Sequence, residues 1–150
     1  MTSIVELWRP VVGYEGLYEV SNMGRVRSLD RTIKNSRGLY KLKGKLMKPR
    51  QGSGGYFLVS FYDVGRITHK RVHVLVLETF IGNRPSPQHD ACHNDGNPAN
   101  NSLNNLRWDS RKENIKDLVK HGTAWFLDPA KLEAQRERCR ETNYKRWRQP

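Results

Sequence analysis

Cysteine, long apolar runs and acidic side chains are all scarce in this 150-residue sequence. Cys92 and Cys139 are too few for a disulfide framework, and no Cys-x-x-Cys pair is present, so we expect no structural zinc. No run of 18 apolar residues occurs, and residues 1–10 lack the pattern of a secretion signal. We therefore expect neither a membrane span nor a secreted disulfide scaffold, and a reducing cytosolic setting.

The charge that is present is strongly basic. The chain has 27 Lys and Arg residues against 15 Asp and Glu, a formal net charge of +12. Residues 1–50 hold 11 basic against 4 acidic side chains, residues 51–108 hold 5 against 4, and residues 109–150 hold 11 against 7. Such basic flanks favour a polyanion through counterion release, although a solvated basic surface is the alternative. We predict a nucleic-acid partner and no membrane.

The first half of the chain is typical of small β structure. LYEVS and RVRSL predict two short strands within residues 17–29, joined by a turn at Asn22-Met23-Gly24. Residues 30–46 are basic and lack periodicity, which predicts a loop or an irregular hairpin, and residues 51–55 resemble a flexible joint. A second hairpin is expected over residues 56–72.

The second half mixes helices with a polar loop. We expect a helix over residues 73–80, because its apolar residues fit one helical face. The Asn-rich run after His93 predicts an ordered loop held by its own side chains, including Asn97, Asn100 and Asn101. A strand at 106–108, a helix over 111–120 and a basic helix from Asp128 follow.

The residues that could carry chemistry are His93, Asn105 and Asn114. A strand, a loop, a second strand and a helix can fold back so that the helix lies beside the first strand. A neutral imidazole can then take a proton from water, and amide oxygens can orient it or help to hold a cation. This combination fits phosphodiester hydrolysis, but the residue types alone are common in purely structural loops.

The segment CHNDGNPANNSLNNLRWDSRKENI resembles the core of the HNH endonucleases, the ββα-metal nuclease group. The preceding RVHVLVLETFIGN is similar to the helix that leads into that core in phage and intron homing proteins. LWRPVVGYEGLYEVSNMGRVRSL resembles the NUMOD-type module at the N-terminus of the same proteins. Together the similar segments cover roughly residues 7–29 and 56–120.

The resemblance implies a role for each matching residue. His93 aligns with the general base that activates water, and Asn105 with the central Asn that pins the loop. Asn114 replaces the last His of the motif and is expected to ligate the metal through its amide oxygen. His73 is a candidate for contacting phosphate or bracing the site; the alternative is a histidine satisfied by a local hydrogen bond.

The metal is expected to be divalent, with Mg²⁺ first and Mn²⁺ as the alternative. The position before the base is often Asp, His or Asn in relatives, whereas this sequence has Cys92, and a thiol is a poor ligand for Mg²⁺. We therefore consider Cys92 and Asp90 as further metal-ligand candidates. The alternatives are an ion held by Asn114, phosphate oxygens and water alone, a softer ion, or a partly disabled enzyme.

Duplex DNA is the expected partner, and no obligate protein partner is indicated. Arg25 and Arg27 alternate with Val26, so a β-ribbon could present both to the major groove, to read bases or only to bind phosphate. The remaining candidates for DNA contact are Lys48, Arg50, Arg66, Lys70, Lys131, Arg138 and Arg146.

These observations together predict an α+β protein. A β module with a basic linker over residues 1–50 grips DNA, a ββα-metal HNH core over residues 51–122 cuts or nicks it, and a basic helix over residues 123–150 extends the contact. The expected setting is the host cytoplasm of a bacteriophage or mobile element. The alternative function is a catalytically decayed HNH-fold DNA-binding protein, for which Cys92 is the favouring feature.

Overall fold

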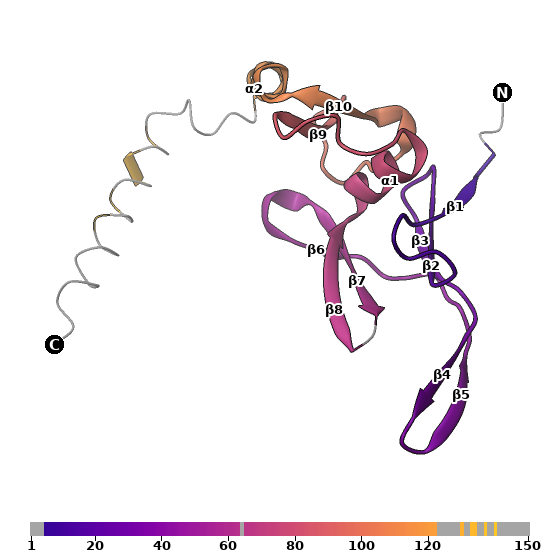
Figure 1. Cartoon of the computed structure of the whole chain (residues 1–150). Helices are drawn as coiled ribbons and strands as arrows, with labels where there is room; N and C mark the ends of the chain where they lie inside the picture. The colour runs from indigo at the N-terminus through magenta and orange to yellow at the C-terminus, as the bar shows by residue number, and fades with distance from the viewer. Residues whose placement is uncertain are drawn as a thin grey trace, which may run out of the picture. The chain divides into compact units, whose positions relative to one another are not determined.

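The computed structural model describes residues 5–63 and 65–122, together with residues 130, 133, 134, 137 and 140. The chain divides into two compact units, Met1–Arg111 and Lys112–Pro150, which are described separately. Several small antiparallel sheets and the helices α1 and α2 confirm the predicted α+β class (Figure 1). The basic helix predicted from Asp128 lies mostly outside the described residues. No described helix is long and apolar enough to cross a membrane.

The N-terminal sheet contains the two predicted strands, β2 (Tyr18–Ser21) and β3 (Val26–Ser28), and a third, β1 (Trp8–Pro10). The order is β1-β2-β3, with every neighbour antiparallel. Gly24 takes φ +78° in the turn between β2 and β3, a conformation that residues with a Cβ adopt at a cost.

The basic segment after this sheet is more regular than predicted. β4 (Arg31–Asn35) and β5 (Gly38–Leu42) form a hairpin with a continuous antiparallel register, and Figure 1 shows it projecting from the rest of the first unit. The expected joint at residues 51–55 contains the end of β6 (Arg50–Gln51) and one 3₁₀ turn (Ser53–Gly55). Backbone pairing here overrides the weak side-chain pattern.

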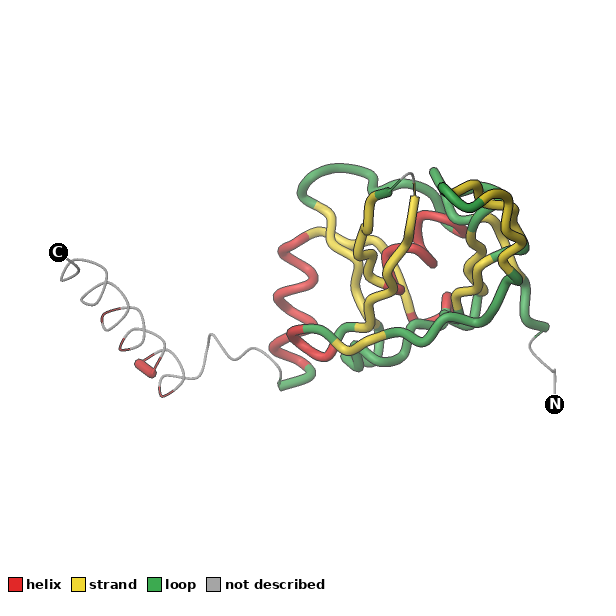
Figure 2. The backbone as a smooth tube through the Cα atoms, turned by 90° about the horizontal axis from the view of Figure 1, so that it is seen from below, coloured by secondary structure: helices red, strands yellow, loops and turns green. Residues whose placement is uncertain are grey.

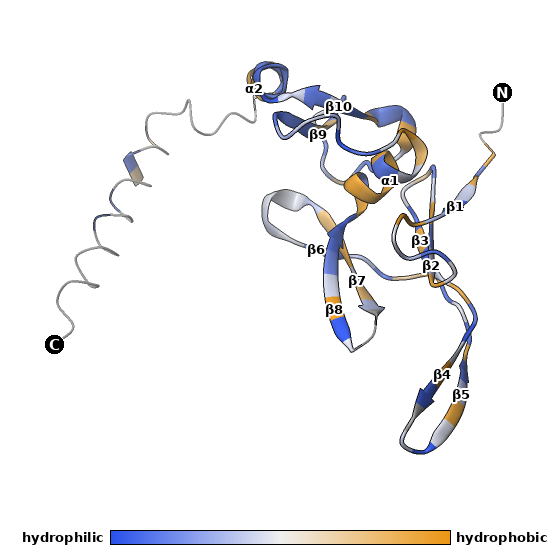
Figure 3. Ribbon diagram, viewed as in Figure 1, coloured by the Kyte–Doolittle hydropathy of each residue, from blue (hydrophilic) through white to orange (hydrophobic). Residues whose placement is uncertain are grey.

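The second predicted hairpin and the helix after it are confirmed. β7 (Phe57–Asp63) pairs with β6 and with β8 (Arg66–Arg71), and α1 (Val72–Phe80) begins directly after β8. The apolar residues of α1 are buried in the first unit, and Figure 3 shows this helix as its most hydrophobic element.

The last sheet pairs β9 (His89–His93) with β10 (Leu106–Ser110), so that His93 lies opposite Leu106. The loop between these strands ends in a 3₁₀ turn, Leu103–Asn105. The predicted helix over 111–120 is present as α2 (Arg111–Lys120) and lies almost entirely in the second unit. The tube in Figure 2 separates these strands and helices by colour.

One apolar core joins these sheets within the first unit. It includes Val20 of β2, Phe61 of β7, Val76 of α1 and Leu106 of β10. The rings of Tyr18 and Phe61 stack with centroids 4.2 Å apart. Each such buried side chain stabilises the fold by about 1.5–3 kcal/mol. The core therefore draws on sequence from both sides of residue 50.

Candidate active site

His93 is the last residue of β9 and points toward the apolar core. Alternation along the strand puts Ala91 and His93 on the same face, and Ala91 packs against the core together with Trp108, its partner on β10. The His93 side chain is buried, with 8% of the residue exposed. Asp90 and Cys92 consequently lie on the opposite face of this two-stranded sheet.

The imidazole of His93 forms a cluster of three rings with the side chains of His73 and Tyr56. The His73 ring, on α1, lies edge-on with its centroid 5.0 Å away. The Tyr56 ring is 5.0 Å from His73 and 6.0 Å from His93, and the Arg71 guanidinium lies over it at 5.2 Å. The cluster therefore draws on the residue before β7, on α1 and on β9.

Both histidines of this cluster are held neutral. Burial, with the nearby charges of His93 and Arg71, lowers the pKa of His73 to about 3. Burial also lowers the pKa of His93 below its ordinary value, and this outweighs the Asn101 hydrogen bond and the Asp95 charge, which raise it. A neutral His93 at pH 7 has a lone pair available to accept a proton.

Asn101 contacts the imidazole of His93 directly. Its Oδ1 lies 3.5 Å from His93 Nε2, a long hydrogen bond, while its Nδ2 donates to the backbone oxygen of Ala99 at 3.1 Å. If Nε2 carries the proton donated to Asn101, Nδ1 is the basic nitrogen. Sequence reasoning assigned Asn101 only to the loop, and no sequence signal pointed to Tyr56.

Asn105 holds the Asn-rich loop closed. Its Nδ2 donates to Asp95 Oδ1 and to the Asn100 oxygen, both at 2.9 Å, and its Oδ1 accepts from the Asp95 backbone N–H at 3.1 Å. The Asp95 carboxylate also accepts from the Asn100 amide and from the Asn97 backbone, which lowers its pKa. This network keeps the chain after His93 in one conformation. Asn105 forms no described hydrogen bond with the imidazole, and its catalytic role stays a prediction.

The candidate metal ligands are divided between the two units, and those of the first unit already have protein partners. Cys92 is buried, and its thiol donates to the Asp90 backbone oxygen at 3.5 Å. The Asp90 carboxylate accepts from Arg84 at 2.9 Å. Asn114 lies half-buried on α2, in the second unit. Among the residues described, no three His, Cys, Asp or Glu side chains cluster to hold an ion. A buried thiol and an ion-paired carboxylate do not by themselves fit a hard cation such as Mg²⁺.

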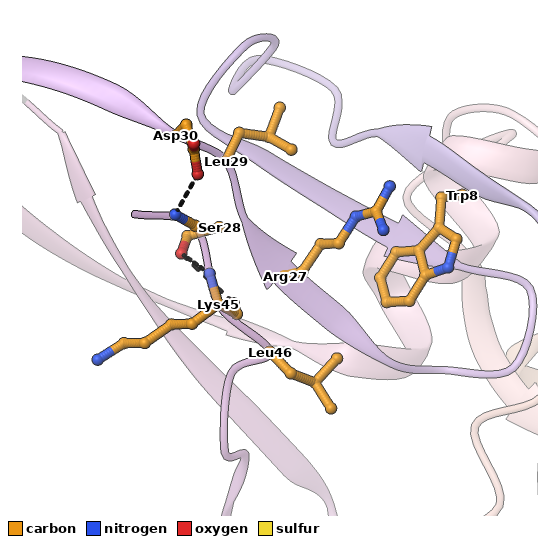
Figure 4. Close-up of a pocket in the computed structure, with 8 residues that line it drawn as sticks. Trp8, Arg27, Ser28, Leu29, Asp30, Lys45 and Leu46 are labelled. Atoms are coloured by element: carbon orange, nitrogen blue, oxygen red, sulfur yellow. Dashed lines mark hydrogen bonds between the residues drawn. The ribbon is translucent and has the colours of Figure 1, made fainter. Parts of the chain in front are cut away.

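Arg25 and Arg27 share one face, as predicted, and both lie over the Trp8 ring, at 5.7 and 4.3 Å. Each also has a carboxylate partner: Arg25 pairs with Glu6, and Arg27 Nε donates to Glu19 at 2.7 Å. Figure 4 shows Arg27 beside Trp8 at the rim of a cavity of about 660 Å³. Contact with DNA through these two residues stays a prediction, and it would compete with Glu6 and Glu19.

The other residues predicted to contact DNA are spread along the chain. Lys48, Arg50 and Arg66 are exposed, and Lys70 is half-buried on β8. Lys131, Arg138 and Arg146 lie outside the described residues.

Comparison with known proteins identifies two family matches in this chain. Residues 6–62 match the NUMOD4 motif, and residues 70–116 match the HNH endonuclease family. The DNA endonuclease I-HmuI of Bacillus phage SP01 is 33% identical over 117 residues, covering 77% of this chain and 59% of the relative. An uncharacterized HNH endonuclease of Acanthamoeba polyphaga mimivirus is 33% identical over 90 residues, covering 60% of this chain and 27% of the relative.

A solved structure, described as DNA binding and cleavage by the HNH homing endonuclease I-HmuI, has a similar fold. It matches with a TM-score of 0.62 and 32% identity, covering 78% of this chain and 60% of that one. The chain thus spans about three fifths of the length of I-HmuI. The His93 cluster and the loop closed by Asn105 lie in the part that matches the HNH family.

Proposed function

Because residues 6–62 carry a NUMOD4 motif and residues 70–116 belong to the HNH endonuclease family, we propose that this chain cuts or nicks double-stranded DNA. The observation that supports this most directly is His93, a neutral imidazole held by His73, Tyr56 and Asn101 at the end of β9. We place the activity in the host cell of a phage or mobile element, because the relative I-HmuI comes from a Bacillus phage.

In the proposed reaction His93 is the general base. Its Nδ1 takes a proton from water, and the water oxygen attacks the scissile phosphorus. The bond from phosphorus to the 3′ oxygen breaks, and the leaving oxygen takes a proton from solvent water, which gives a 3′ hydroxyl opposite a 5′ phosphate. Asn101 and the His73 ring fix the orientation of the base, which matters because proton transfer requires hydrogen-bond geometry.

A divalent ion would neutralise charge on the scissile phosphate. The donors of the first unit do not fit a hard ion on their own, so metal dependence, with Mg²⁺ before Mn²⁺, stays a prediction. Asn114 is its proposed ligand, and Cys92 and Asp90 are the further candidates.

Plasmid cleavage tests the nuclease proposal. Supercoiled plasmid is incubated with the full chain or with His93→Ala, in Mg²⁺, Mn²⁺ or EDTA. We expect nicked or linear product from the unmodified chain, no product in EDTA, and a rate about 10²–10⁴-fold lower for the variant, the range that a general base contributes. Cleavage by His93→Ala at the rate of the unmodified chain would show that His93 is not the general base.

Cys92→Asp, which puts a carboxylate at the thiol position, tests the metal site. We expect its Mg²⁺-supported rate to rise about tenfold or more, in the range by which ligand-shell changes alter activity. Cys92→Ser is the matched control, since it removes the thiol without adding a charged oxygen. A rise with Cys92→Ser as large as with Cys92→Asp would contradict a ligand role at this position.

The second candidate is a DNA-binding protein with a decayed nuclease site, which the buried thiol at Cys92 favours. It predicts no product with either metal, and a salt-sensitive gel shift that His93→Ala leaves unchanged.

A further inference from the structure

A second cavity of the first unit, of about 700 Å³, lies between two hairpins. One wall is the β4–β5 hairpin, with Arg31, Thr32, Ile33 and Leu42. The other consists of Tyr62, Gly65, Arg66 and Ile67, and Leu17 completes the lining. We call this cavity the hairpin groove. It does not include His93, so it is distinct from the ring cluster.

Arg31 is fixed within the hairpin groove. Its guanidinium lies over the Tyr18 ring at 5.2 Å, and its Nη2 donates to the Tyr18 hydroxyl at 3.4 Å. The same hydroxyl accepts from the Tyr62 backbone N–H at 2.9 Å. A cation that is already ordered binds an anion with less entropy loss than a free side chain.

One donor of Arg31 has no acceptor. Its Nη1 is buried and forms no hydrogen bond with any described residue. A buried charged donor without a partner is unfavourable, and native folds contain few of them. After a rotation of the side chain toward the hairpin groove, an anionic oxygen there would satisfy this group.

The lining selects for a particular type of anion. It carries two cations, Arg31 and Arg66, and no carboxylate among its described residues. The same lining contains the partly exposed apolar side chains Ile33, Tyr62 and Ile67. A lining with both cationic and apolar side chains complements a sugar–phosphate strand, in which deoxyribose rings separate the phosphates.

We propose that the hairpin groove binds one backbone strand of duplex DNA, with the Arg31 guanidinium on a phosphate oxygen and Arg66 on a neighbouring phosphate. The identity of the partner rests on the proposed function. The assignment of an anion site to the hairpin groove depends on the unpaired donor, the two cations and the basic excess of residues 1–50. Arg31 is therefore a DNA-contact residue that sequence reasoning did not select.

Salt-dependent binding tests the groove separately from cleavage. Duplex DNA is titrated in EDTA with the His93→Ala chain and with the same chain carrying Arg31→Gln, Arg66→Gln or both. Each lost phosphate contact should reduce the slope of log K against log salt by about 0.9, and the double variant should bind about tenfold or more weakly. Lys34→Gln is the matched control, because it removes one charge from the same hairpin outside the lining.

Two further measurements distinguish a lost DNA contact from unfolding and from a change of charge alone. Thermal melting of each variant excludes unfolding, and Arg31→Lys, which keeps the charge but loses the planar fork, should bind less tightly than the parent chain. An unchanged salt slope in the double variant would contradict DNA binding in the hairpin groove. An equal loss of affinity with Lys34→Gln would contradict it too. Absence of duplex binding by the parent chain would overturn it as well. If cutting fails with every metal but Arg31→Gln still weakens binding, the groove stands and the nuclease proposal falls.

Discussion

His73 is a buried group that the surrounding fold keeps uncharged. The unfolded chain binds a proton on this histidine near pH 6.5, whereas the folded chain binds one only near pH 3. Its contribution to stability is therefore full above pH 6.5 and declines as pH falls from 6.5 toward 3. Between pH 7 and pH 5 we expect a loss of about 2 kcal/mol in the free energy of unfolding.

His73→Phe should remove this contribution of His73 while keeping a ring against His93, and the pH dependence that remains includes that of His93, whose pKa is also lowered by burial. Urea unfolding of both proteins at pH 7 and pH 5 measures it. A variant that loses as much stability as the parent chain over this interval would show that His73 is not the titrating group.

At the residue scale, sequence could indicate His93 and Asn105 because a spaced motif contains both. It could not indicate Tyr56 or the contact from Asn101 to His93. Tyr56 comes from a segment 37 positions before His93, and only the folding of β7 against α1 brings its ring there. Nor could it show that Arg25 and Arg27 have Glu6 and Glu19 as partners.

At the element scale, the turn between β2 and β3 packs against the loop that carries Asn101. A Cβ at Gly24 would lie 2.7 Å from Asn101 Cβ and 2.8 Å from its backbone oxygen. The backbone N–H of Leu103 also donates to the Asn22 oxygen at 2.8 Å. The N-terminal sheet thus helps to set the position of a residue that contacts His93.

Gly24→Ala should lower stability by about 1–3 kcal/mol, through its positive φ and the clash, and should reduce cleavage by displacing Asn101. Gly13→Ala is the matched control, since Gly13 has φ +79° but open space around its Cβ position. Thermal melting and plasmid nicking measure the two effects. Equal losses of stability and of nicking in both variants would mean that the close approach of Gly24 to Asn101 affects neither property.

The elements that the sequence predicts well are those with side-chain patterns, such as α1 and the β7–β8 hairpin. β1 is not predictable in this way, because three residues ending in Pro10 show no alternation. The β4–β5 hairpin cannot be told from a loop by its pattern, because the apolar and polar residues of GLYKL do not alternate and all of them are exposed. Its pairing comes from backbone hydrogen bonds, which leave no mark on composition.

At the scale of the first unit, the two family segments share one core. Val11, Val20 and Val26 from the first segment pack with Phe61, Val76 and Leu106. We expect a fragment of residues 1–50 to lack cooperative unfolding, because most partners of its apolar side chains are missing. Circular dichroism during thermal melting, with the full chain as reference, measures this. A sigmoidal transition in the fragment would support the predicted domain boundary at residue 50.

The contact between Gly24 and Asn101 has a consequence for protein engineering. An N-terminal segment transplanted from a relative would have to bring a turn without a Cβ at this point, and a backbone carbonyl in the position of the Asn22 carbonyl. A donor segment chosen for its DNA contacts alone would shift the loop behind His93. Retargeting this scaffold is therefore a problem of matching one turn to one loop before any base contact is redesigned.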